Sequence, residues 1–144
     1  MNYVRETSAG YLTNWAARLF ARALERRLGT GSGPMPVFFA LQNGRALTQK
    51  ELAISATVEQ PTMANTLSRM ERDGLVIRTP DPNDRRSALV SLTPLGLERA
   101  EAAFQVAVQV NGIATDALRP EERPVFHDMM RRIVAALERD GADD

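Results

Sequence analysis

Two adjacent arginines, Arg85 and Arg86, lie in a run of turn-forming residues between two short segments in which apolar and polar side chains alternate. A guanidinium carries a planar fork of donors that suits phosphate oxygens and base edges. On a narrow loop it can enter the minor groove of DNA, where negative potential concentrates. Asp81 and Asp84 stand close by in the sequence. Two interpretations follow: a solvated turn that neutralises its own charges, or a loop whose carboxylate orients an arginine toward DNA.

A second set of polar side chains precedes this run. Met63, Leu67 and Met70 recur at spacings of four and three, which predicts a helix with a buried stripe. The side chains between them then face outward, where asparagine, glutamine and threonine can hydrogen-bond base edges in the major groove. On an arbitrary helix such residues are solvated surface, but a basic hairpin directly after the helix favours DNA contact. The outward-facing set is Thr62, Asn65, Thr66 and Arg69, with Gln60 at the entrance of the helix.

Short elements must position these two sets. Thr48 and Glu51 have the pattern of a capping box, so we expect a helix of about two turns to open there. Pro61 suits the first position of the next helix, and Gly74 suits its left-handed end. Alternation then predicts a hairpin with strands 75–79 and 88–92 and a long tip over 80–87. This order of elements is typical of a winged helix-turn-helix, whose second helix enters the major groove.

Further helices are predicted on both sides of this region. Apolar spacing predicts a helix over 11–28 and a short helix over 36–41. A long helix is expected to begin at Pro94, and a last helix at Pro120, because proline suits the first turn. The predicted fold class is therefore mostly α with a small β-hairpin.

The sequence offers few residues for catalysis or metal binding. There is no cysteine, which excludes a disulfide, a thiolate nucleophile and a cysteine zinc site. His127 is the single histidine, and no Gly-x-Ser-x-Gly elbow accompanies it. We therefore expect no enzyme activity, no catalytic residue, no metal site and no cofactor. No apolar run reaches the roughly 18 residues of a membrane span, so we expect no membrane partner and a cytoplasmic location.

The charges balance, with 18 basic and 18 acidic side chains. A neutral molecule lacks a long-range basic field for nucleic acid, which keeps open an alternative: a winged-helix protein-interaction module without DNA binding. The balance is uneven along the chain, however. Residues 1–44 sum to +3, residues 45–99 to +1 and residues 100–144 to −4. The acidic excess therefore lies at the C-terminal end, and the middle of the chain is freer to approach an anion.

Several segments of the sequence resemble the MarR family of bacterial transcription regulators. The Asp-Arg-Arg wing in this register is the most specific of them, and the clear motifs span residues 46–99. The matching segments are Leu47-Thr48-Gln49-Lys50-Glu51-Leu52-Ala53, Gln60-Pro61-Thr62-Met63, Arg69-Met70-Glu71-Arg72-Asp73-Gly74-Leu75-Val76, Asp81-Pro82-Asn83-Asp84-Arg85-Arg86 and Leu92-Thr93-Pro94-Leu95-Gly96.

The resemblance implies a sequence-specific DNA-binding transcriptional regulator that acts as a repressor. Its partners would be a second copy of the chain, in an obligate homodimer, and a double-stranded, pseudo-palindromic operator. Residues 1–33 and 112–144 would form the helical dimerisation region. Residues 34–111 would form the winged helix-turn-helix with the start of the long connecting helix.

Individual positions also carry over from the resemblance. Asp84 and Arg86 correspond to the family's wing pair, in which the arginine enters the minor groove. Arg119 departs from the small polar residue that the family often has before the last helix, so we expect a weaker start for that helix. By matching positions, the resemblance places on the recognition helix Gln60, Pro61, Thr62, Asn65 and Arg69. The base-specific role of each of these residues does not transfer, because these roles vary across the family.

Family members often bind small aromatic or phenolic acids between the dimerisation and DNA-binding regions. Such a ligand alters the spacing of the two DNA-reading parts and would release the protein from DNA. Aromatic walls and one cation make candidates for a site of this kind, with core packing as the competing interpretation for each aromatic side chain. The candidates are Tyr11, Trp15, Arg18, Phe38 and Phe39.

Overall fold

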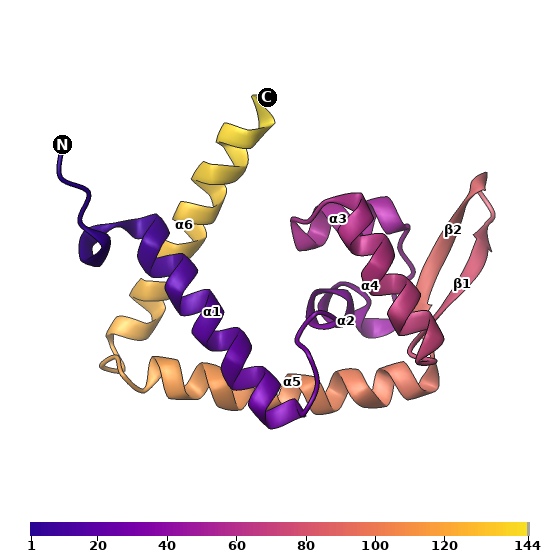
Figure 1. Cartoon of the computed structure of the whole chain (residues 1–144), viewed down its shortest axis with the longest axis horizontal. Helices are drawn as coiled ribbons and strands as arrows, with labels where there is room; N and C mark the ends of the chain where they lie inside the picture. The colour runs from indigo at the N-terminus through magenta and orange to yellow at the C-terminus, as the bar shows by residue number, and fades with distance from the viewer. Residues whose placement is uncertain (144) are drawn as a thin grey trace. The chain divides into compact units, whose positions relative to one another are not determined.

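The computed structural model describes residues 1–143 and confirms a mostly helical chain with an antiparallel hairpin (Figure 1). In chain order the elements are η1 (Arg5–Thr7), α1 (Ala9–Leu28), α2 (Met35–Ala40), η2 (Gln42–Gly44), α3 (Gln49–Ala56), α4 (Gln60–Arg72), β1 (Val76–Asp81), β2 (Asp84–Leu92), α5 (Pro94–Thr115) and α6 (Glu122–Ala142). The chain forms two compact units, Met1–Ala107 and the part from Val108 onward, and the division falls within α5. The functional division into 1–33 with 112–144, and 34–111, stays a prediction.

The core of the first unit lies among α2, α3 and α4. Val37 and Leu41 from the α2 region are completely buried, and Leu52 of α3 packs in the same cluster. The predicted buried stripe of α4 is confirmed, because Met63, Leu67 and Met70 are at most 2% exposed. Burying this stripe leaves the opposite, polar face of α4 at the surface.

Local caps set the limits of α3 and α4. The hydroxyl of Thr48 accepts a hydrogen bond from the N–H of Glu51 at 3.2 Å, as a capping box requires. The same hydroxyl donates to the carboxylate of Glu51 at 3.2 Å. In a full capping box that carboxylate would instead accept from the backbone N–H of Thr48. Gly74 has φ +75° and ends the α4 region as predicted. Pro61 occupies the second helical position, because α4 begins at Gln60.

The hairpin corrects the prediction of a long tip over 80–87. The strands continue to Asp81 and Asp84, and only Pro82 and Asn83 lie between them. Pro80 pairs with Ala88, yet the next residue of β1, Asp81, pairs with Asp84. The three residues 85–87 therefore form a bulge on β2. Turn-forming residues mask this extension of the ladder in the sequence.

A short β-bridge closes the region between α3 and the hairpin. The N–H of Leu47 donates to the carbonyl of Val90 at 3.1 Å, and the N–H of Val90 donates to the carbonyl of Leu47 at 2.7 Å. Val90 is fully buried at this point. The segment that leads into α3 therefore pairs with β2.

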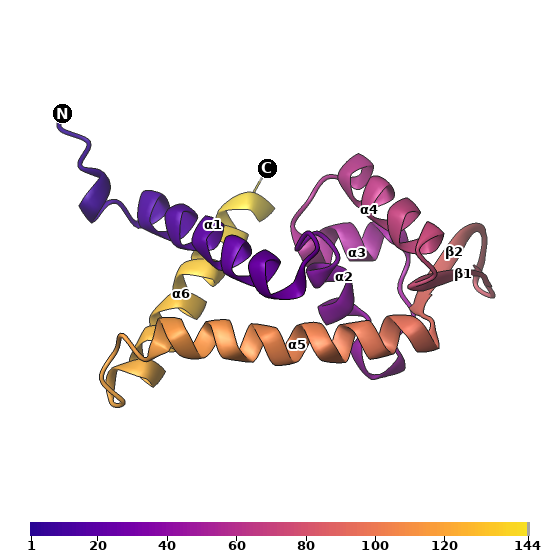
Figure 2. The same cartoon turned by 60° about the horizontal axis from the view of Figure 1, so that its bottom comes forward.

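The end of α4, the start of β1 and the start of α5 meet in one joint. Figure 2 shows β2 leading directly into the first turn of α5. Helix α5 begins at Pro94 as predicted, and the hydroxyl of Thr93 caps it by accepting from the N–H of Gly96 at 3.0 Å. The same hydroxyl donates to the carbonyl of Gly74 at 2.5 Å. The N–H of Thr93 donates to the carbonyl of Leu75 at 3.0 Å.

The second unit contains the end of α5 and α6. The last helix begins at Glu122 and not at Pro120, which corrects the prediction. The N–H of Arg119 donates to the carboxylate of Glu122 at 2.8 Å, and the intervening residues form a turn. The Arg119 side chain also lies 3.2 Å from a carboxylate oxygen of Glu122. Arg119 therefore takes part in the helix start that it was expected to weaken.

A second arginine caps the C-terminal end of α5. Nε of Arg123 donates to the carbonyl of Thr115 at 3.0 Å, and Nη2 donates to the carbonyl of Leu118 at 3.4 Å. The carbonyl of Thr115 also accepts from the N–H of Leu118 at 3.0 Å, and Leu118 lies beyond the end of α5. The side chain therefore adds bonds to the helix end and to the turn that follows it. Among residues 1–143, no helix has the length and apolar character needed to cross a membrane.

Candidate nucleic-acid interface

The outer face of α4 carries the polar residues that the sequence placed there. Gln60, Pro61, Thr62, Asn65 and Arg69 are exposed, and Thr66 is half-buried. The hydroxyl of Thr66 donates to the carbonyl of Thr62 at 3.1 Å, one turn back in the same helix. The amide of Asn65 and the guanidinium of Arg69 have no side-chain partner among residues 1–143. Their donors and acceptors remain available to a partner on this face.

The wing presents two guanidiniums on the bulge of β2. Arg85 and Arg86 are exposed, and the hairpin projects away from α3 and α4 (Figure 1). The carboxylate of Asp84 accepts a hydrogen bond from the backbone N–H of Arg86 at 3.0 Å. The carboxylate of Asp81 accepts from the backbone N–H of Asn83 at 2.9 Å. Both carboxylates therefore shape the turn, in the manner of Asx-turns.

This geometry contradicts the interpretation of a turn held by its own ion pairs, and the orientation of an arginine toward DNA stays a prediction. Within residues 1–143, neither Arg85 nor Arg86 forms an ion pair. The turn does not neutralise its own charges, and Asp84 fixes the backbone of Arg86 and not its guanidinium. Both guanidiniums are thus exposed to solvent and have no ion-pair partner among residues 1–143.

An ion pair that the sequence analysis missed links the wing to α4. Nε of Arg78 in β1 lies 3.1 Å from a carboxylate oxygen of Glu71 in α4. The alternation of β1 carries the signal for this contact, because Arg78 shares a face with Val76, which is buried. The pair holds the base of the hairpin against the C-terminal part of α4.

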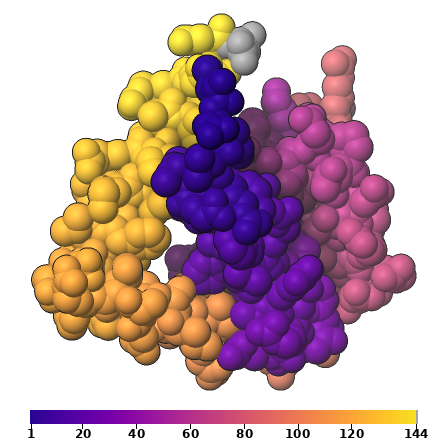
Figure 3. Space-filling view, turned by 60° about the vertical axis from the view of Figure 1, so that its left-hand side comes forward, coloured from indigo at the N-terminus to yellow at the C-terminus, as the bar shows by residue number. Residues whose placement is uncertain are grey.

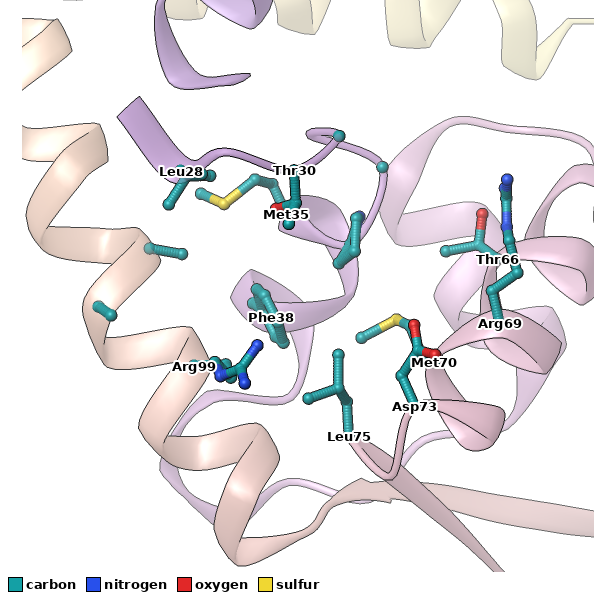
Figure 4. A pocket seen from close by; sticks show the side chains of 15 residues that line it. Leu28, Thr30, Met35, Phe38, Thr66, Arg69, Met70, Asp73, Leu75 and Arg99 are labelled. Atoms are coloured by element: carbon teal, nitrogen blue, oxygen red, sulfur yellow. The ribbon is translucent and has the colours of Figure 1, made fainter. Parts of the chain in front are cut away.

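A cavity of about 730 Å³ lies beside α4 in the first unit. Figure 4 shows Phe38, Met70 and Leu75 around it, with Arg99 from α5 on one side and Thr66 and Arg69 from α4 on the other. The wall is mainly apolar, and its polar groups include the carboxylate of Asp73. Arg69 therefore belongs both to the outer face of α4 and to the rim of the cavity.

Only one of the five candidate ligand residues lines this cavity, namely Phe38. Phe39 is on the same helix but stacks on Phe104 of α5, with 5.0 Å between ring centroids. Tyr11 and Trp15 meet edge to face on α1 at 6.0 Å. Arg18 is exposed on the same helix. The sequence could not group the lining residues, because most of them are indistinguishable from ordinary core residues.

The aromatic pair on α1 has its own cation. The guanidinium carbon of Arg5 lies 6.0 Å from the ring centroid of Tyr11 and 5.8 Å from that of Trp15. A hydrogen bond to Glu6, and to a lesser degree the side chain of Tyr11, raises the pKa of Arg5. Within residues 1–143, no group of three histidine, cysteine or acidic side chains lies together as a metal site would require.

The fold and this surface define a winged helix-turn-helix protein with an exposed recognition helix, α4, and a basic wing. The model of the MarR family matches residues 37–88. The transcriptional regulator HosA of Escherichia coli O111:H- is 32% identical over 100 residues, which cover 69% of this chain and 74% of that protein. The chain therefore belongs to the MarR family, and it is a transcriptional regulator and not an enzyme.

Two further relatives agree with this assignment. The HTH-type transcriptional repressor NicR of Pseudomonas putida is 29% identical over 102 residues, covering 71% of this chain and 65% of NicR. Among solved structures, the PcaV transcriptional regulator of Streptomyces coelicolor, in complex with its natural ligand, is 26% identical. That structure superposes with a TM-score of 0.82 and covers 95% of this chain and 99% of PcaV.

Proposed function

We propose that this protein is a homodimeric repressor that binds a pseudo-palindromic operator with α4 in the major groove and the wing in the minor groove. The observation that carries the proposal is the free, exposed state of the polar face of α4 and of Arg85 and Arg86. Unpaired guanidiniums are poor contributors to a fold but good phosphate and base donors. The name of NicR supports the repressor role.

The contacts follow from the geometry of the two elements. Gln60, Pro61, Thr62, Asn65, Thr66 and Arg69 form the recognition surface of α4, whose N-terminal residues would reach base edges. Asn65 is suited to adenine, and Arg69 to guanine or to a phosphate. Asp84 holds the turn that carries Arg85 and Arg86. Arg86 would enter the minor groove, where a narrow width concentrates negative potential.

Dimerisation is the role we assign to residues 1–33 and 112–144. Helix α1 contains no buried residue, and its exposed side chains include the large apolar residues Leu12, Trp15 and Leu19, which are 43–51% exposed. The surface of α1 lies open in the space-filling view of Figure 3. An exposed apolar stripe of this kind on a helix is typical of an interaction surface.

The terminal helix α6, taken by itself, also carries an exposed apolar stripe. It too contains no buried residue, and its stripe includes Phe126, Ile133 and Leu137 at 40–66% exposed. A second copy of the chain would cover these stripes. Two recognition helices in such a dimer would lie about one DNA turn apart, roughly 34 Å, which explains a two-fold operator.

A small aromatic or phenolic acid is the effector that we propose for the cavity beside α4. The apolar wall suits an aromatic ring, Arg69 and Arg99 suit a carboxylate, and Asp73 could accept from a phenolic hydroxyl. Arg69 is also a proposed DNA contact, so a ligand that engages it would withdraw it from the operator. The structure of PcaV in complex with its natural ligand supports the proposal that this chain also binds a ligand.

Operator binding is tested with a duplex selected from a random library by the full-length protein. Arg86→Ala should weaken binding by about 1–3 kcal/mol, or roughly 5- to 150-fold, at fixed salt. Arg72→Ala is the matched control, because Arg72 is also exposed, pairs only with Asp73 and lies at the C-terminal end of α4, away from the N-terminal residues proposed to reach base edges. It should leave affinity unchanged. Equal affinity of the Arg86→Ala variant and the parent would refute the wing assignment, and no binding of any duplex at low salt would favour a protein-interaction module.

Effector binding is tested by thermal unfolding with benzoate, salicylate and 4-hydroxybenzoate. A ligand at 100 times its dissociation constant stabilises a protein by about 2.7 kcal/mol, which gives a measurable rise in melting temperature. Arg99→Gln should reduce that rise, because it removes one guanidinium from the cavity wall. No rise with any of the three acids at millimolar concentration would contradict the choice of ligand class.

A further inference from the structure

The joint between α4 and α5 is built from backbone groups. The N–H of Leu75 donates to the carbonyl of Met70, in the last turn of α4, at 2.8 Å. The carbonyl of the same residue accepts from the N–H of Thr93 at 3.0 Å. One peptide segment at Leu75 thus connects the recognition helix to the residue that caps α5. Leu75 is 8% exposed, so this connection is protected from water.

Thr93 adds a second connection through its side chain. Its hydroxyl donates to the carbonyl of Gly74 at 2.5 Å and accepts from the N–H of Gly96 at 3.0 Å. The donor side of the hydroxyl holds the end of the recognition helix, and the acceptor side caps α5. These two roles can be separated chemically, because a carboxylate can cap a helix but cannot donate.

Gly96 lets the two elements approach this closely. A Cβ at that position would lie 2.0 Å from the carbonyl oxygen of Leu75 and 3.3 Å from a methyl carbon of Leu92. Gly96 is buried and lies in the first turn of α5. Only a residue without a side chain fits between α5 and the start of β1.

We infer that Thr93 and Gly96 are positioning residues, which hold the recognition helix at one angle on α5 and so determine which operator half-site spacing the dimer accepts. The inference rests on the proposed function, because spacing matters only for a dimer on a two-fold site. One base pair adds about 3.4 Å to the DNA axis, or about 1.7 Å for each of the two recognition helices. If the contacts of Thr93 were lost, a displacement of α4 of about an ångström would be comparable with that distance.

Thr93→Asp is the variant that separates positioning from capping. Aspartate is a good N-cap and keeps the bond from the N–H of Gly96, but it cannot donate to the carbonyl of Gly74. Thr93→Ser keeps the hydroxyl and should rescue the parent behaviour. Thr48→Asp is the matched control, since it makes the same exchange at the cap of α3, where the hydroxyl bonds only to Glu51. Gly96→Ala disturbs the same joint by steric overlap and serves as the second variant if Thr93→Asp fails to fold.

The experiment is a selection from a random duplex library with the full-length protein, followed by titration of the enriched site and of versions with one base pair inserted or removed between the half-sites. The parent, Thr93→Ser and Thr48→Asp should discriminate against a changed spacing by about tenfold or more, similar to losing one base contact. Thr93→Asp should select the same half-site sequence but reduce that discrimination to about threefold or less. Gly96→Ala should shift or broaden the preferred spacing in the same way.

The experiment distinguishes failure of this inference from failure of the proposed function. If the parent selects a two-fold site of one spacing and both joint variants keep its full discrimination, the positioning role is refuted while the proposed function stands. If the parent enriches no duplex, or a single half-site without a preferred spacing, the proposed function itself fails and the inference with it. Loss of half-site preference together with spacing preference in folded Thr93→Asp would also refute the inference, because the joint would then be shaping the recognition surface itself.

Discussion

Replacing Gly96 by alanine tests the close approach at the joint through stability alone. The new Cβ would meet the carbonyl oxygen of Leu75 at 2.0 Å, and backbone cannot swing away as a flexible side chain can. Ordinary contact needs more than 3 Å, so α5 and the start of β1 must separate by about an ångström. This separation would stretch the bond from the N–H of Thr93 to Leu75 and the bond from its hydroxyl to Gly74.

The magnitude follows from three terms. Overpacking of a close-fitting site costs about 1–3 kcal/mol, and each weakened hydrogen bond about 1 kcal/mol. Alanine is favoured over glycine in a helix by about 1 kcal/mol, which offsets part of the loss. The expected net loss in the free energy of unfolding is about 2–4 kcal/mol for Gly96→Ala.

Gly112→Ala is the matched control in the same helix. A Cβ there has no atom within 4 Å, so the helix propensity term acts alone and should stabilise the protein by about 1 kcal/mol. Both variants are compared with the parent by urea unfolding at equal protein concentration, because a dimer's stability depends on concentration. Equal or greater stability of Gly96→Ala relative to the parent would refute the steric reasoning. Destabilisation by Gly112→Ala would show that helix propensity is not the controlling term in α5.

Three further outcomes follow from described contacts. Thr57 has φ +54°, a left-handed conformation that costs a β-branched residue about 1–2 kcal/mol. Glycine relieves this strain but adds entropy to the unfolded chain, so Thr57→Gly should raise the free energy of unfolding, measured with urea, by about 0.5–1 kcal/mol. Arg123→Ala removes the side chain that bonds carbonyls at and just after the end of α5, and should lower the free energy of unfolding by about 1–2 kcal/mol in the same assay. Arg132→Ala breaks only an exposed ion pair and should lower it by about 0.5 kcal/mol or less. Arg78→Gln breaks the partly exposed pair with Glu71 and should cost no more than about 1 kcal/mol, so a larger loss would mean that the pair carries more than surface electrostatics.

Much of the helix-turn-helix could be predicted from local patterns. Gly74 and Thr93 mark element ends through their own backbone or side-chain chemistry, which does not depend on distant contacts. The buried stripe of α4 follows from spacing alone, and the exposed recognition surface then follows as its complement. These features are short-range, and the sequence displays them directly.

The remaining features depend on contacts between distant segments. The bulge at 85–87 arises because Asp81 pairs with Asp84 across a tight turn, and no alternation in the sequence signals it. The cavity is the space left between Phe38, Leu75 and residues of α5, each of which reads as core by itself. Arg99 was not singled out at all, because a single arginine on a helix gives no sign that it borders a cavity. Its place could be found only once α4 and α5 were in position.

The bridge between Leu47 and Val90 has a consequence for how the DNA-contacting region can move. The chain passes Leu47, forms α3, α4 and β1, and returns to the same point through Val90, so this part of the backbone is a ring closed by two hydrogen bonds. A ring of this kind cannot lose α4 by fraying from one end. A motion that tilts α4 must carry the hairpin with it, and the proposed major-groove and minor-groove contacts would then be made and released together.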